Sequence, residues 1–211
     1  MSARITTVGL KEVEQFLEER PQVARRAARL AVNDTTRRKV VPLSIKEMKE
    51  QTNFPPGYLR DKTRFGVRKL ATEADLTAIV SARFRPTSLA RFATGNQTIQ
   101  GARRRGGIRV SVNPGGAKFL RRAFFVRLRR GRDTSDGFNL GLAVRLRPGE
   151  RLKGRRKGGA GVMLDENVAL LYGPSVDQVF RDVSTTESPR FAELLEREFL
   201  RQWVRLNSST R

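Results

Sequence analysis

The stretch LGLAVRL at residues 140–146 decides the fold of this chain. Its large apolar residues, Leu140, Leu142, Val144 and Leu146, alternate with glycine, alanine and arginine. Because successive side chains of a strand point to opposite faces, this alternation predicts a strand with one buried face. Such strands are typical of antiparallel sheets that keep one face on a core and the other in solvent.

Strand patterns recur on both sides of this stretch. Ile108, Val110 and Val112 alternate with polar residues, and a short apolar run begins at Val168. Gly-rich turns separate these segments, which favours an antiparallel sheet. The predicted strands cover residues 76–80, 108–112, 119–128, 140–146 and 168–172.

Helical periodicity marks the N-terminal part of the chain. Apolar residues recur on one face over residues 10–17 and again over residues 22–38, where alanine is frequent. These small side chains permit the close approach of a partner helix or sheet. Ser44 and Glu47 have the spacing of a capping box, which predicts a further short helix that begins there and ends near Gln51.

A second helical pattern lies near the C-terminus. Ser188 has the character of an N-cap and Pro189 that of a first helical residue, so we expect the helix to begin there. An apolar stripe follows, and we expect it to pack on the sheet. The stripe consists of Phe191, Leu194, Leu195, Phe199, Trp203 and Leu206.

Together these patterns predict an α+β fold. It has a central antiparallel sheet, N-terminal helices, a C-terminal packing helix and long basic Gly/Arg loops. The 211 residues suit a single domain. Within it we expect a helical part over residues 1–62, a sheet with basic loops over 63–172, a C-terminal helical part over 173–206 and a polar tail over 207–211.

Positive charge is concentrated in the middle of the chain. The net charge is +22, yet residues 83–161 alone hold 21 Lys and Arg residues against three acids. Such like charges repel one another in a compact state, so an anionic partner or full solvation must offset them. Nucleic acid, anionic lipid and an acidic protein face all satisfy this condition.

Two loops, residues 93–107 and 148–161, combine these cations with glycine. Arginine forms bidentate bonds with phosphate, and glycine lets a backbone approach closely. The first loop resembles one unit of an RGG segment, and the nearest aromatic residue for stacking is Phe92. The strand over residues 121–131 mixes phenylalanine and arginine, as protein interfaces do. The predicted contact residues for DNA or a protein partner are Arg103, Arg104, Arg105, Arg127, Arg129, Arg130, Lys153, Arg155, Arg156 and Lys157.

Enzymatic activity is not expected. The chain has no Cys and no His, which excludes disulfides, zinc fingers and catalysis by thiol or imidazole. Residues 149–154 superficially match a phosphate loop, but Arg155 stands where that motif has Lys. Acids at 133–136 and 165–166 fit turns better than a metal centre. We therefore expect no cofactor and no metal.

A membrane partner is not expected either. No apolar run approaches the roughly 18–20 residues that cross a bilayer. The first residues lack the apolar core of a signal peptide. These patterns predict a protein that is made in a cytoplasm.

Four segments occur together in an informative order. They are the Ala-rich helix Val23–Asn33 with Arg37 and Arg38 after it, the stretch Arg85–Phe92 with its L-x-R-F pattern, the strand Ala123–Leu128 running into Gly131, and Leu171–Val176 with its Gly-Pro-Ser turn. In this order they resemble the minor tail protein Z family of tailed bacteriophages, also described as tail-completion proteins. The resemblance covers about residues 20 to 200, and the loop at 148–161 departs from it.

The resemblance implies a structural protein of the virion, without enzymatic activity, that is assembled in the host cytoplasm. Such a protein completes the head-proximal end of the tail, or neck, and supports head–tail joining. We expect copies of the chain to form a ring, with a hexamer matching tail symmetry. The implied neighbours are the tail tube or tail terminator and the head–tail connector. The basic loops would contact acidic neighbours or the packaged double-stranded DNA, and both roles stay open.

Two other functions remain as alternatives. A free-standing, non-specific nucleic-acid-binding protein would also explain the charge, and it predicts binding that weakens steeply with salt. A carboxylate-metal nuclease would require Asp133 or Asp165 for magnesium-dependent cleavage.

Overall fold

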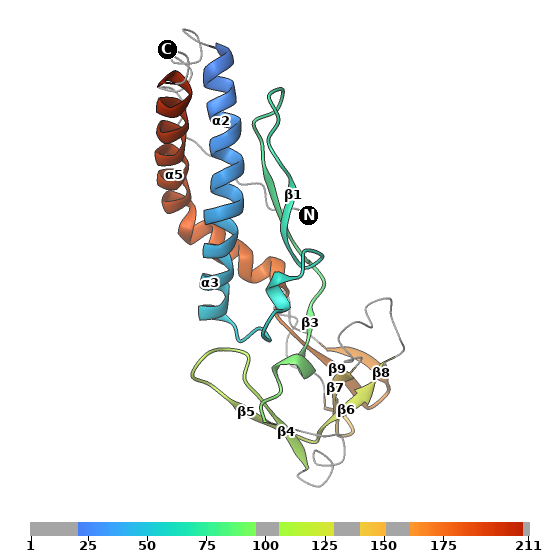
Figure 1. Ribbon diagram of the computed structural model, residues 1–211. Helices are drawn as coiled ribbons and strands as arrows, with labels where there is room; N and C mark the ends of the chain where they lie inside the picture. Colours follow the sequence, from blue (N-terminus) through green and yellow to red (C-terminus); the bar gives the residue numbers. More distant parts are fainter. Residues whose placement is uncertain (1–20, 96–105, 129–139, 151–160, 209–211) are drawn as a thin grey trace. The chain divides into compact units, whose positions relative to one another are not determined.

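A computed structural model describes residues 21–95, 106–128, 140–150 and 161–208 (Figure 1). The chain divides into two compact units, and both can belong to one folding domain, so the single-domain prediction stays a prediction. The helical unit comprises Met1–Met48, Leu59–Arg83 and Val179–Arg211, and the sheet unit comprises Lys49–Tyr58 and Phe84–Gln178. The predicted helix at 10–17 lies outside the described residues.

A continuous helical segment opens the described chain. It consists of α2 (Pro21–Thr35), a π-helical turn η1 (Thr36–Val40) and α3 (Val41–Gln51). In the π turn the N–H of Val41 donates to the carbonyl of Thr36. The adjacent residues Thr35 and Thr36 are both buried there, so the buried stripe of the helix steps by one position.

The capping box predicted at Ser44 is wrong. Ser44 lies inside α3, its side chain is buried, and its Oγ has no hydrogen-bond partner in the described part of the chain. The helix does not stop before Ser44, because the π turn carries it through from α2. A Ser-x-x-Glu spacing inside such a helix has no free N–H groups to satisfy.

The long C-terminal helix α5 (Val176–Ser208) begins thirteen residues before the predicted start at Pro189, which lies inside it. The true cap is Ser175: its Oγ accepts from the Gln178 N–H at 3.1 Å, and Gln178 Oε1 accepts from the Ser175 N–H at 3.0 Å. This is a capping box with glutamine at the fourth position. Figure 1 shows α5 changing direction along its length, as an internal proline causes.

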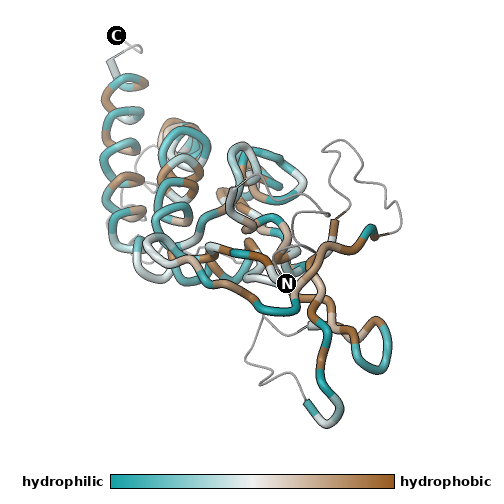
Figure 2. Tube along the Cα trace, turned by 90° about the horizontal axis from the view of Figure 1, so that it is seen from below, coloured by the Kyte–Doolittle hydropathy of each residue, from teal (hydrophilic) through white to brown (hydrophobic). Residues whose placement is uncertain are grey.

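The C-terminal helix packs on α2, which corrects the prediction that it packs on the sheet. The small residues Ala27, Ala28 and Ala31 form a buried cluster with Phe199. Because alanine leaves room for an aromatic ring, the two helices can approach closely along this stripe. Figure 2 shows hydrophilic and hydrophobic residues alternating around the helical turns. Leu76, Leu195, Trp203 and Leu206 pack around the cluster.

Polar groups also join the two helices. Gln202, which is buried, donates from Nε2 to Asp34 Oδ2 at 3.2 Å and to Glu198 Oε1 at 2.8 Å. Asn33 holds the following segment, because its side chain donates to the Ala71 carbonyl and accepts from the Ala71 N–H. The Gln202 amide therefore ties α5 to α2, and the Asn33 amide ties α2 to the segment around Ala71.

The helical unit also contains an antiparallel ribbon, β1 (Phe65–Lys69) and β2 (Ile79–Ala82). Phe65 anchors it, with its ring edge-on to Phe180 and the centroids 4.9 Å apart. The strand predicted at 76–80 is therefore found a few residues later. A hydrogen bond from Lys69 lowers the pKa of Asp75 to about 2.

The sheet unit holds the strand LGLAVRL as β7, at the middle of an antiparallel sheet in the order β3-β9-β7-β6, with β8 also on β9. Leu142 of β7 pairs with Phe125 on one side and Leu171 on the other. The described residues form three sheets in place of one central sheet, and antiparallel pairing is confirmed in all of them. The strands of this sheet are β3 (Thr87–Ser88), β6 (Ala123–Arg127), β7 (Leu140–Arg145), β8 (Val162–Asp165) and β9 (Val168–Gly173).

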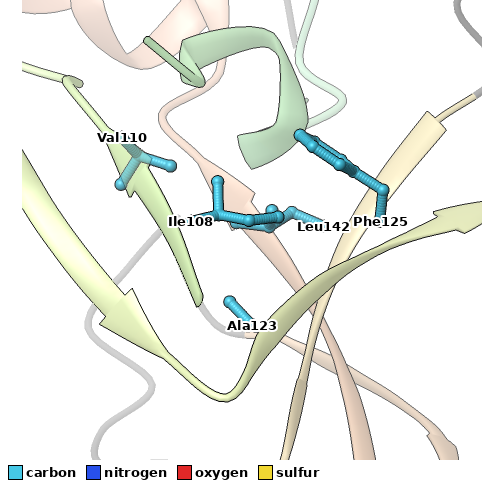
Figure 3. Packing of buried hydrophobic residues seen from close by; sticks show 5 residues of the cluster. All are labelled: Ile108, Val110, Ala123, Phe125 and Leu142. Carbon is cyan, nitrogen blue, oxygen red and sulfur yellow. The ribbon is translucent and has the colours of Figure 1, made fainter. Parts of the chain in front are cut away.

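A hairpin of β4 (Gly107–Val110) and β5 (Lys118–Arg121) packs its apolar face on this sheet. Figure 3 shows the side chains of β4, β6 and β7 that point toward one another in this core. The single strand predicted over 119–128 is split into β5 and β6 at Arg122, whose φ is 63°. A left-handed residue turns the chain sharply, so the two halves belong to different sheets. The core cluster is Ile108, Val110, Ala123, Phe125 and Leu142.

Two short 3-10 helices complete the described elements. They are η2 (Tyr58–Arg60) and η3 (Leu89–Phe92). Within the sheet unit the ring of Phe92 lies against Gly173, where an added Cβ would stand 2.8 Å from Phe92 Cε2. Glycine is therefore required at the end of β9 for η3 to pack there.

Candidate partner-binding surface

One of the ten predicted contact residues lies in the described chain. Arg127 is the last residue of β6, and its side chain is exposed. The other nine lie outside the described residues. They are Arg103, Arg104, Arg105, Arg129, Arg130, Lys153, Arg155, Arg156 and Lys157.

The carboxylate of Glu150 forms its hydrogen bonds and its ion pair within the sheet unit. Arg122 donates to both of its carboxylate oxygens, at 2.8 and 3.0 Å, and the Arg147 N–H donates at 2.8 Å. These bonds, the Arg122 bonds first, hold the pKa of Glu150 down to about 2, and the same pair raises the pKa of Arg122. Of the three acids in residues 83–161, this one offsets the cation beside it, and the other two, Asp133 and Asp136, lie outside the described residues.

Other cations of the sheet unit have no acidic partner in the part of the chain that the structure describes. They lie just before β3, in the β4–β5 hairpin and at the end of β6, and all are exposed. A surface of this kind attracts anions over a distance of about 10 Å at 0.1 M salt. The residues are Arg85, Lys118, Arg121 and Arg127.

The outer face of the β4–β5 hairpin adds an aromatic ring to these cations. Arg109 lies directly opposite Phe119, and Gly107 lies opposite Arg121, so all four share one face. Phe119 is 46% exposed. A Cβ at Gly107 would stand 2.7 Å from Phe119 Cζ, so the ring rests on the backbone of β4. We call these four residues the hairpin face.

Sequence reasoning missed Phe119 and chose the wrong aromatic residue. Phe92, taken as the nearest stacking partner, is 2% exposed and packs its ring 5.9 Å from that of Phe54. It belongs to the core and cannot stack on a partner. The alternation Lys118-Phe119-Leu120-Arg121 contained the signal, since it places Phe119 and Arg121 on the face opposite Leu120.

The strand β6 has one face in the core and one face that is partly exposed. Ala123 and Phe125 are buried in the core cluster. On the other face, Phe124 is half-buried with the Arg145 guanidinium 5.9 Å from its ring centroid. This cation–π contact is worth about 0.5–1 kcal/mol at an exposed site, so it orients Arg145 without removing its charge.

The basic surface has a composition that suits the binding of anions. The described ranges contain no group of three or more acids that could hold a metal ion. Asp165 and Glu166 lie exposed at the β8–β9 turn, and Asp133 and Asp136 are outside the described residues. No helix in the described segments is long and apolar enough to cross a membrane. Guanidinium groups beside an exposed ring can bind phosphates, carboxylates and flat bases.

Comparison of the chain with protein-family models, with curated proteins and with solved structures finds no match. A functional proposal therefore depends on the residues and their arrangement.

Proposed function

We propose that the protein is a structural component of a tailed-bacteriophage virion that completes the head-proximal end of the tail and supports head–tail joining. The proposal includes a ring of identical subunits, with the tail tube or terminator and the head–tail connector as neighbours.

One observation supports it most. Three of the four segments behind the resemblance to minor tail protein Z are distant in sequence but belong to one sheet. Arg85–Phe92 supplies β3 and η3, Ala123–Leu128 supplies β6, and Leu171–Val176 supplies the end of β9 and the start of α5. Strand β3 pairs with β9, which joins β6 through β7. Their order in the chain thus corresponds to a single packing arrangement, as expected of segments that define a fold.

The uncompensated cations give this fold its partner chemistry. In a virion neck the available anions are packaged DNA and the acidic faces of neighbouring proteins. Phe and Arg are also both enriched at protein interfaces. The hairpin face is one described part of this basic surface.

Deletion of the gene in the source phage tests the proposal. We expect negative-stain micrographs of lysates to show filled heads separate from tails, and expression of the protein in trans to restore joined particles. Normal infectious particles from the deletion would overturn the proposal.

A second experiment separates the two partners of the basic surface. Arg109→Gln is combined with the neutralisation of Arg103, Arg104 and Arg105, and Arg197→Gln on the exposed side of α5 is the matched control. Particles that join normally but lose DNA would assign the surface to DNA. Heads and tails that fail to join would assign it to a protein neighbour.

The hairpin face also favours one alternative, a free-standing nucleic-acid-binding protein. Stacking of one base on an aromatic ring is worth about 1–3 kcal/mol, or roughly 5- to 150-fold in affinity. If the alternative holds, Phe119→Ala weakens single-stranded DNA binding by this amount in an anisotropy titration, whereas Val204→Ala on α5 does not. Weak binding that Phe119→Ala does not change would contradict the nucleic-acid-binding alternative.

A further inference from the structure

The strand β8 presents unusual apolar exposure. Val162, Met163 and Leu164 are 55%, 48% and 48% exposed and are consecutive in the chain. Successive strand residues point to opposite faces, so apolar side chains meet solvent on both faces of β8. Single exposed apolar residues are ordinary, but three in a row on one strand mark a contact surface.

The same strand lies at an open edge of its sheet. In the described chain β8 pairs with β9 alone, so its outer backbone groups face no strand. Edge strands are usually protected by lysine, proline or an inward charge, and Val162–Leu164 contains none of these. A bulge after Met163 is the protection that is present, and it acts at the end of the strand.

The opposite edge of the sheet is β6, which pairs with β7 alone among the described strands. Exposed cations stand at its two ends, Arg121 just before it and Arg127 as its last residue. By contrast, β8 ends in the exposed acids Asp165 and Glu166. The end of β8 is therefore acidic and the ends of β6 are basic, while β3 pairs with a different part of β9 on the β8 side of the sheet.

Strand directions determine how these edges would meet. Each neighbouring pair in this sheet is antiparallel, so β8 runs opposite to β6. If a second copy continues the sheet in the same orientation, its β6 lies antiparallel to β8 of the first. The acidic end of β8 then comes next to Arg121 at the start of β6.

We propose that β8 of one copy adds to the β6 edge of a second copy, with Val162–Leu164 covered by that edge and Asp165 facing Arg121. The two surfaces are different, so the contact is heterologous and repeats from copy to copy, closing into a ring where the rotation permits. Backbone pairing and apolar burial supply the affinity, and the charges set the register.

This inference deepens the ring of the proposed function, but it is tested on the purified full chain. Sedimentation velocity over a wide range of protein concentration is expected to show self-association. Met163→Lys should weaken it about tenfold or more, because a half-exposed side chain loses its burial and a charge enters the edge. Val204→Lys, on the exposed side of α5, is the control and should leave association unchanged.

A charge exchange identifies the partner edge. Asp165→Arg and Arg121→Glu should each weaken association several-fold. An equimolar mixture of the two variants should recover it, because the arginine introduced in one chain then faces the glutamate introduced in the other. Circular dichroism spectra that match the unmodified protein ensure that folding is intact.

Three results would overturn the inference. A chain that stays monomeric at every concentration removes the contact, and β8 is then left for a different protein. Sensitivity to Met163→Lys without an effect of Arg121→Glu indicates that β8 pairs with β8, not with β6. Self-association that the substitutions on β8 and beside β6 do not change places the ring interface elsewhere. The gene-deletion test of the proposed function is then unaffected.

Discussion

The helical unit and the sheet unit use their charges in different ways. In the helical unit, several cations form ion pairs with acids of the same unit: Arg29 lies 3.6 Å from Glu73, and Arg201 bridges Glu198 and Asp34. In the sheet unit, Glu150 is paired with Arg122, and exposed cations such as Arg121 have no acid within the described chain. The comparison teaches that net charge is a poor guide to function until it is divided by unit. Ion pairs join several charged residues of the helical unit, although exposed cations such as Arg25 and Arg26 have none within the described chain. The sheet unit has the larger excess of positive charge and the greater need of an anionic partner.

Natural reporters allow the two units to be followed separately. The chain has one tryptophan, Trp203, and it lies in the helical unit. Its two tyrosines, Tyr58 and Tyr172, both lie in the sheet unit. Tryptophan fluorescence and tyrosine second-derivative absorbance therefore monitor different parts of one molecule.

The largest effect is expected from Phe199→Ala in the helical unit. Removing a buried ring that packs on Ala27, Ala28 and Ala31 should lower the free energy of unfolding by about 3–5 kcal/mol. Urea denaturation monitored at Trp203 measures it, and Val204→Ala on the exposed side of α5 should change it by less than about 0.5 kcal/mol. If the tyrosine transition shifts by the same amount, the units unfold as one and the comparison loses its basis.

A smaller effect is expected from Gly107→Ala in the sheet unit. The added Cβ would stand 2.5 Å from the Leu120 carbonyl oxygen and 2.7 Å from Phe119 Cζ, so backbone or ring must move. Such overpacking costs about 1–3 kcal/mol, measured in the tyrosine transition. Gly116→Ala in the same hairpin meets nothing within 4 Å and is the matched control. Equal stability of the two variants would mean that Phe119 does not rest on β4.

Added salt should make the thermal unfolding midpoints of the two units differ by a few degrees. Screening relieves repulsion among the cations of the sheet unit, so its tyrosine-monitored midpoint should rise by about 2–4 °C between low and moderate salt. The Trp203 midpoint should rise less, because its unit has a smaller excess of cations and contains ion pairs that salt weakens. Thermal melts at a series of chloride concentrations measure both, and a common shift would contradict the division of charge.

The smallest effect is expected from Glu150→Gln. The pKa of Glu150 is lowered to about 2 from 4.5, so its pair with Arg122 stabilises the fold above pH 4.5, and this contribution is lost as the pH falls toward 2. The variant should therefore be slightly less stable at pH 7 and equal to the unmodified protein near pH 2. Urea midpoints over this range test the prediction, and a deficit that persists at low pH would show that the amide disturbs the turn in another way.

The sequence predicts strands better than it predicts what the helices pack against. Alternation identified β7 and β4, because a strand's period of two is local. The partner of the C-terminal stripe was misassigned to the sheet, since Phe199 shows only that it needs an apolar surface. The Ala-rich stripe of α2 already indicated a close-packing partner, but a helix and a sheet satisfy it equally.

Helix ends were misjudged for a related reason. Ser188-Pro189 and Ser44-Ile45-Lys46-Glu47 are typical of helix starts, yet both lie inside helices. A start signal acts only where the preceding residues leave the helix, and the capping bonds of Ser175 had already begun α5 upstream. Among the candidate contact residues, the pattern of charge was visible from sequence, but the exposure of Phe119 depends on the pairing of β4 with β5.

The π turn at Thr36–Val40 gives the first helix an unusual dependence on length. Before it the buried face passes through Ala24, Ala28 and Ala31, and after it through Val40, Ser44 and Met48. Because the π turn accommodates one extra residue, deleting the exposed Lys39 would restore regular α-helical spacing and make the buried stripe continuous, with Ser44 and Met48 still in the interior. A deletion within the regular turns of α2 or α3 would instead rotate all that follows by about 100°. The segment can therefore lose one residue at the π turn, whereas elsewhere in these helices the number of residues is fixed.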